Sequence, residues 1–159
     1  MPNTPTPQAS NKLQALVTLI FLFSVGCADT PPLASSRDES SAKGFPANPE
    51  RAMVYIYADF APIHTHNIPV VIGTQIVAQL GGGTFLLTGL APGKYTFTSV
   101  GGANNPPLTL NVQAGRVYFL RMHQLWGYGY LGGAEYIAVN ESEGKKEVLK
   151  RRRVPLVTN

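Results

Sequence analysis

The stretch VVIGTQIVAQLGGGTFLLTGLAPGKYTF, residues 70–97, decides the fold class because it joins short apolar segments through closely spaced turn residues. Gly73 and Thr74 separate two apolar segments, which is typical of a β-hairpin. Pro92 presets φ near about −65° and Gly93 accepts a positive φ, so this pair predicts a tight turn. The stretch therefore predicts consecutive short strands joined by turns.

The same pattern continues through the rest of residues 52–141. In AMVYIYADF, Val54 and Ile56 fall on one side of the chain and Tyr55 and Tyr57 on the other, as in a strand. The segments LTLNVQAGRVYFLRMHQ and AEYIAVN predict three more strands. About seven or eight short strands at spacings of about 8–12 residues indicate an all-β sandwich or barrel. The 16 glycines, the 13 prolines and a charged fraction of only 14% agree with a turn-rich β domain.

Two pieces of this region carry a family resemblance. One is the L-x-PG-K-Y-T turn, Leu90 to Thr96, and the other is the AG-R-x-Y-F-L-R strand, Ala114 to Arg121. In this order, residues 52 to about 150 resemble the domain-of-unknown-function 2846 family of bacterial envelope proteins, many of them predicted lipoproteins. The turn is also similar to turns of PEGA-type and transthyretin-like sandwiches. The resemblance implies a single immunoglobulin-like or prealbumin-like β-sandwich, and it implies no catalytic residues.

The N-terminal segment, residues 1–26, has the order of a cleaved signal peptide. Lys12 precedes the apolar run LQALVTLIFLFSV, and a small residue follows before the cysteine. The run is shorter than the stretch of about 20 residues that a mature membrane-spanning helix needs. A buried core helix is the alternative interpretation of the same run.

The sequence SVGC, residues 24–27, resembles the bacterial lipobox, in which a lipid is attached to the cysteine before cleavage. The two residues before the cysteine match that pattern, whereas Ser24 stands where Leu, Val or Ile is usual. The resemblance implies palmitate-type acylation of Cys27 and a membrane anchor. Ala28 favours sorting to the outer membrane, facing the periplasm. A secreted protein with a free thiol at Cys27 is the alternative.

The composition divides the remaining chain into three parts. Residues 27–51 are rich in Pro, Ser and Ala, so we expect a flexible linker that holds too little apolar surface to repay ordering. The sandwich is expected over residues 52–141. Residues 142–159 are expected to form a basic tail that contains a short helix. We expect this tail to be exposed to solvent, and contact with anionic lipid is the alternative. Since the tail holds most of the net charge of +4, nucleic acid is not an expected partner.

The predicted domain is poor in side chains that perform chemistry. Residues 52–140 contain Asp59 and Glu135 as their only acids, Ser99 as their only serine, and no cysteine. A nucleophile, a base and an orienting acid would have to come from this small set. We therefore expect a non-enzymatic protein without a cofactor.

Metal binding is the alternative that the histidines leave open. His64 and His66 lie on one side of the chain if that segment is extended, and His123 could join them. Such a site would make the protein a metal-dependent envelope enzyme. The opposing interpretation is a polar loop between two strands.

The segment LWGYGYLGG supplies the best candidate binding surface. Trp126, Tyr128 and Tyr130 alternate with other residues on a glycine-rich stretch, where they could stack on a glycan or contact an envelope protein. Packing of these aromatics over one end of the core is the alternative. Taken together, these features predict a lipid-anchored, non-enzymatic binding or structural sandwich. An adhesin-like glycan binder and a metal-dependent envelope enzyme are the alternatives.

Overall fold

The computed structural model describes residues 32–59, 67–100, 106–125 and 133–157, and within these ranges it contains nine strands and two helices. The strands are β1 (Ala52–Ala58), β2 (Ile68–Ile72), β3 (Gln75–Leu80), β4 (Thr84–Leu90), β5 (Gly93–Ser99), β6 (Leu108–Val112), β7 (Val117–Gln124), β8 (Ala134–Val139) and β9 (Arg152–Arg153). The helices are α2 (Ser36–Lys43) and α3 (Glu141–Leu149).

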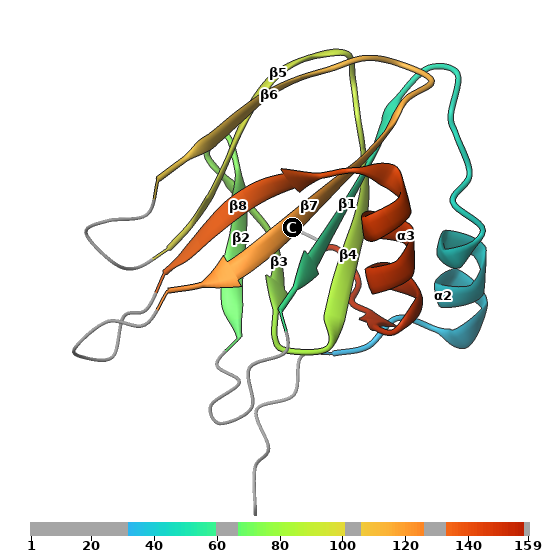
Figure 1. The fold of residues 1–159 in the computed structure, drawn as a ribbon, viewed down its shortest axis with the longest axis horizontal. Coiled ribbons are helices and arrows are strands. Elements are labelled where there is room, and N and C mark those ends of the chain that lie inside the picture. Colours follow the sequence, from blue (N-terminus) through green and yellow to red (C-terminus); the bar gives the residue numbers. More distant parts are fainter. Residues whose placement is uncertain (1–31, 60–66, 101–105, 126–132, 158–159) are drawn as a thin grey trace, which may run out of the picture.

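The strands form two sheets that pack face to face, which confirms the all-β sandwich (Figure 1). One sheet has the order β8-β7-β1-β4-β9 and the other has the order β3-β2-β5-β6. The hairpin at Gly73 is confirmed, and its φ of 64° explains why glycine stands there. The strand count exceeds the expected seven or eight because β9 lies in the predicted tail.

Strand β1 is buried on both faces. Val54, Ile56 and Ala58 point into the core between the sheets. The alternate residues Tyr55 and Tyr57 lie on the other face, where α2 and α3 cover the sheet (Figure 1). If the outer face of this sheet were exposed to solvent, every second residue of β1 would be exposed. Tyr55 and Tyr57 are buried because the helices cover that face.

A second, aromatic cluster fills the space between the sheet and the two helices. The ring of Tyr55 stacks on that of Phe119 at 5.1 Å and contacts that of Phe45 at 5.4 Å. Gly144 of α3 lies directly over Phe119, with no room for a β-carbon. The close approach of helix and sheet therefore requires glycine at this position.

The prediction of a flexible linker over residues 27–51 is wrong for residues 32–50. Ser35 caps α2 by accepting a hydrogen bond from the Asp38 amide at 3.1 Å. The buried Ala42 accepts a hydrogen bond from the hydroxyl of Tyr55 at 2.7 Å, and Phe45 joins the aromatic cluster. The composition of this segment suggested too little apolar surface for folding, because it does not show that Ala42 and Phe45 pack against aromatic residues of the sheet.

The C-terminal segment forms the predicted short helix, α3, but the expectation of a solvated tail is wrong. Only 2% of Arg151 is exposed, and β9 pairs in parallel with the start of β4. Val154 is buried in the core between the sheets. The folded unit therefore extends over residues 32–157, beyond the boundaries 52–141 expected from the sequence.

Candidate functional site

The ends of several elements gather at one end of the sandwich, which we call the proximal end. Strand β1 ends there at Ala58, and β4 begins there at Thr84, because these strands are antiparallel neighbours. Strand β7 runs parallel to β1 and ends at Gln124, opposite the start of β8 at Ala134. The buried hydroxyl of Ser99 bonds to the backbone of Ala134 at 2.8 and 3.2 Å and ties the second sheet to this end.

The described chain also begins at the proximal end. The amide of Ala34 donates to the carbonyl of Arg153 at 2.8 Å, next to the pairing of Thr84 with Arg152. The opposite end of the sandwich, the distal end, carries tight turns at Gly73 and Gly115. The chain therefore enters the fold at the end from which residues 60–66 and 126–132 also leave it.

Most of the site residues expected from the sequence lie outside the described residues. These are Cys27, His64, His66, Trp126, Tyr128 and Tyr130. What the structure adds is where their flanking residues lie. The amide of Leu125 donates to the carbonyl of Gly133 at 2.8 Å, so the two residues that flank 126–132 lie together at the proximal end.

His123, the remaining metal candidate, forms a pair with Asp59. Its Nδ1 lies 2.9 Å from Oδ2 of Asp59, and their side chains are 48% and 33% exposed. Within the described ranges, no group of three or more His, Cys, Asp or Glu side chains is placed to hold a metal ion. An exposed pair of this kind contributes about 0–1 kcal/mol to stability, and what it fixes is the orientation of the imidazole.

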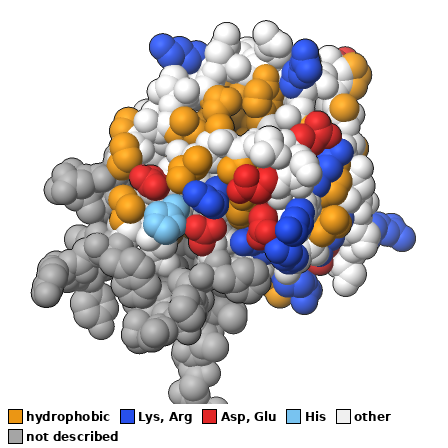
Figure 2. Space-filling view, viewed as in Figure 1, with side chains coloured by type: hydrophobic (Ala, Val, Ile, Leu, Met, Phe, Trp, Pro, Cys, Tyr) orange, Lys and Arg blue, Asp and Glu red, His pale blue; other side chains and the backbone are white. Residues whose placement is uncertain are grey.

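Arg151, which follows α3, places a buried positive charge next to Ala58, the residue before Asp59. The Nε of Arg151 donates to the carbonyl of Ala58 at 2.8 Å, and its Nη1 donates to the carboxylate of Glu147 at 2.7 Å. The guanidinium also lies 4.6 Å from the centre of the Tyr57 ring. Figure 2 shows acidic and basic side chains gathered with a histidine on this face.

The charged and polar groups of this cluster, Arg151, Glu147 and Tyr57, hold α3 against the sheet. Hydrogen bonds from Lys150 and then Arg151 lower the pKa of Glu147 to about 2. Burial raises the pKa of the Tyr57 hydroxyl to about 12. Both groups therefore keep one protonation state near neutral pH, whereas an acid or base catalyst needs a pKa near the working pH. The cluster fits a structural role.

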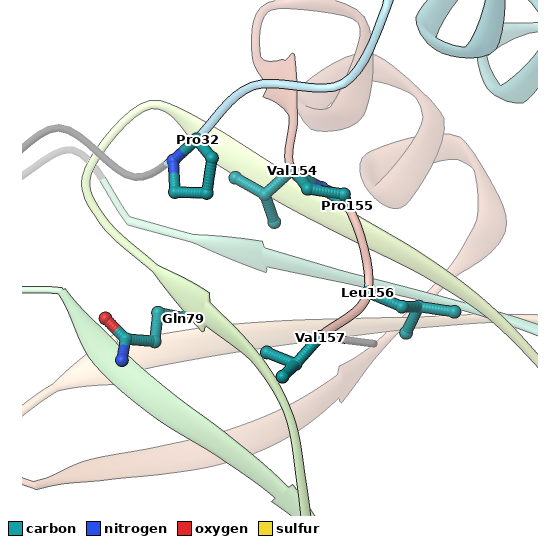
Figure 3. A pocket seen from close by; sticks show the side chains of 6 residues that line it. All are labelled: Pro32, Gln79, Val154, Pro155, Leu156 and Val157. Carbon is teal, nitrogen blue, oxygen red and sulfur yellow. The ribbon is translucent and has the colours of Figure 1, made fainter. Parts of the chain in front are cut away.

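A groove of about 410 Å³ lies along the sandwich edge formed by β9 and β3 (Figure 3). The backbone bridges the sheets here: the Val154 amide donates to the Phe85 carbonyl, and the Val157 amide donates to the Val77 carbonyl, both at 2.9 Å. The lining residues are Pro32, Gln79, Val154, Pro155, Leu156 and Val157.

The groove is mainly apolar and open to solvent. Leu156 is 43% exposed, Val157 is 50% exposed, and Leu33 beside the groove is 46% exposed. This surface was not among the sites predicted from the sequence, although the run VPLV after the basic residues was an available signal. Neither described helix is long and apolar enough to cross a membrane.

Comparisons with known proteins add one relative. The chain is 27% identical over 139 residues to an uncharacterized protein of Haemophilus influenzae, and the match covers 86% of this chain and 81% of that protein. No family model matches the chain. The resemblance to the domain-of-unknown-function 2846 family therefore stays a prediction, and the similarity to an uncharacterized bacterial protein indicates no activity.

Proposed function

We propose that this protein is a bacterial envelope lipoprotein, anchored through an acylated Cys27, whose β-sandwich has a binding or structural role without catalysis. The observation that carries the proposal is the point at which the chain enters the fold. Only residues 28–31 separate Cys27 from Pro32, which already lines an apolar groove. A lipid on Cys27 would place that surface next to the membrane, on the outer membrane if Ala28 directs sorting.

The polar groups of the described residues support a non-catalytic role. Ser99, the only serine in residues 52–140, has a buried hydroxyl that is bonded to backbone. Arg151 and Glu147 hold α3 against the sheet. The pair of Asp59 and His123 orients an imidazole at the surface.

The test is to express the full chain in a bacterium and to measure the intact mass of the membrane-extracted protein. We expect a chain that begins at Cys27 and carries acyl chains, since several chains make membrane attachment effectively permanent. The control variant Cys27→Ser should lose the acyl mass and the membrane attachment. A product that carries an unmodified Cys27 would contradict the proposal.

The rival function, glycan or partner binding through Trp126, Tyr128 and Tyr130, is favoured by one observation. The hydrogen bond between Leu125 and Gly133 fixes both ends of that segment on the sandwich. The variant Trp126→Ala should then abolish glycan binding in an array measurement. An array without signal for the unchanged protein would remove the glycan-binding form of this rival.

A further inference from the structure

The apolar groove lies where the described chain begins. Pro32 forms part of its wall, and Leu33 follows with 46% of its surface exposed. Most of the remaining wall comes from the C-terminal segment, where Leu156 and Val157 are 43% and 50% exposed. Residues that are far apart in the sequence thus present exposed apolar side chains on one edge of the sandwich (Figure 3).

The reach of the preceding chain limits where this edge can lie. From Cys27 to Pro32 there are five residue steps, which at about 3.6 Å each span at most about 18 Å. Strand β4, with 7 residues, is about 23 Å long by itself. A lipid on Cys27 would therefore hold the proximal end close to the bilayer, and the distal turns would be farther away.

The charges beside the groove do not oppose a membrane surface. The carboxylate of Glu39 is paired with Lys43 and with Arg152, each at 2.8 Å. Arg152, two residues before the groove, has a side chain that is 58% exposed, whereas in α2 the exposed Arg37 is followed by the exposed Asp38. Exposed arginines next to apolar side chains suit a bilayer with anionic head groups.

We propose that this groove, with its exposed Leu156 and Val157, and the neighbouring Leu33 rest on the lipid bilayer that holds the anchor, so that the sandwich has one fixed orientation on the membrane. The inference rests on the proposed acylation of Cys27. A second copy of the chain is the competing occupant, and the test below distinguishes it.

The experiment uses the full acylated chain in vesicles of phosphatidylethanolamine and phosphatidylglycerol. An environment-sensitive NBD fluorophore is attached to Gln79→Cys in the groove or to Gln113→Cys near the distal turn between β6 and β7. Both positions are exposed glutamines, and the acylated Cys27 does not react with the label. Doxyl-labelled lipids should quench the emission at Gln79 strongly and leave the emission at Gln113 unchanged.

Matched substitutions test the groove itself. The double variant Leu156→Glu/Val157→Glu should lose the quenching at Gln79, because charged side chains resist insertion. The control Leu149→Glu changes another exposed leucine, 54% exposed on α3 and outside the groove, and should keep the quenching. Circular dichroism of each variant verifies that it is folded.

The outcomes separate the inference from the function on which it rests. If mass spectrometry finds acyl chains on Cys27 but lipid quenches Gln79 no more than Gln113, the orientation is refuted and the lipoprotein function stands. A blue-shifted Gln79 probe without lipid quenching would show that protein and not lipid covers the groove, as a second copy would, and would also refute it. Absence of acyl chains on Cys27 would refute both.

Discussion

Replacement of Gly144 by alanine sets two physical effects against each other. Alanine is the better helix former by about 1 kcal/mol, so propensity alone predicts that Gly144→Ala stabilises the protein. In the structure, however, an added β-carbon would overlap Phe119, with its Cδ1 at only 2.5 Å and other atoms of that side chain closer still. Overpacking of this kind costs about 1–3 kcal/mol.

The surroundings of Phe119 decide which effect is larger. The overlap involves the β-carbon and the ring itself, so the whole side chain would have to move. The ring is held by Tyr55 at 5.1 Å and by Phe45 at 5.8 Å, and 3% of the residue is exposed. We therefore expect the high end of the packing cost, and a net destabilisation of about 1–2 kcal/mol after the gain in propensity.

Urea unfolding, followed by far-ultraviolet circular dichroism, measures this difference. Lys146 lies on the exposed side of the same helix, so the pair Lys146→Ala and Lys146→Gly reports propensity alone. In the double variant Gly144→Ala/Phe119→Leu the two changes should cost less than the sum of their separate effects, because a smaller side chain leaves room. A more stable Gly144→Ala protein would refute the packing argument.

Three further predictions concern the contacts that hold α2 and α3 on the sheet. Tyr55→Phe removes the buried hydrogen bond to the Ala42 carbonyl and should lower the free energy of unfolding in urea by about 1 kcal/mol. The pKa of Glu147 is lowered from 4.5 to about 2, so its stabilisation is complete above about pH 4.5 and is lost as the pH falls toward 2. Glu147→Gln should therefore flatten the fall of Tm over that range, whereas Glu141→Gln, which changes an exposed carboxylate of the same helix, should leave it steep. Arg151→Lys keeps the charge but not the planar group that bonds to both β1 and Glu147, and it should destabilise the protein by about 1–3 kcal/mol in the same urea assay; an unchanged midpoint would show that the guanidinium is dispensable.

The parts of the fold that could be predicted are those with local causes. The alternation around Val54 and the glycine turn at Gly73 depend on neighbouring residues, so strands and hairpins were visible in the sequence. Helix α2 depends on distant partners, such as Arg152, whose Nε bonds to Glu39 across 113 positions. A composition-based prediction cannot include such a contact, which is why the segment was interpreted as a linker.

The candidate site divides in the same way. The aromatic residues Trp126, Tyr128 and Tyr130 and the cysteine can be read directly from the sequence, but their roles depend on where the fold places their neighbours. The groove consists of Pro32, Gln79 and residues 154–157, and no short motif connects these positions. It arises because the backbone at Val154 and Val157 bridges two sheets, which is a consequence of topology.

Because α2 packs against the sandwich, an anchor on Cys27 would restrict the orientation of the domain on a membrane. A flexible linker up to residue 51 would let the sandwich turn freely at a distance from the membrane. The contacts of Ala34 with Arg153 and of Glu39 with Arg152 instead join the incoming chain to the C-terminal segment. A pull on the anchor would therefore act first on this junction, next to β9, and only then on the core strands. With an anchor on Cys27, this arrangement would present one defined face to the membrane and would leave the distal turns facing outward.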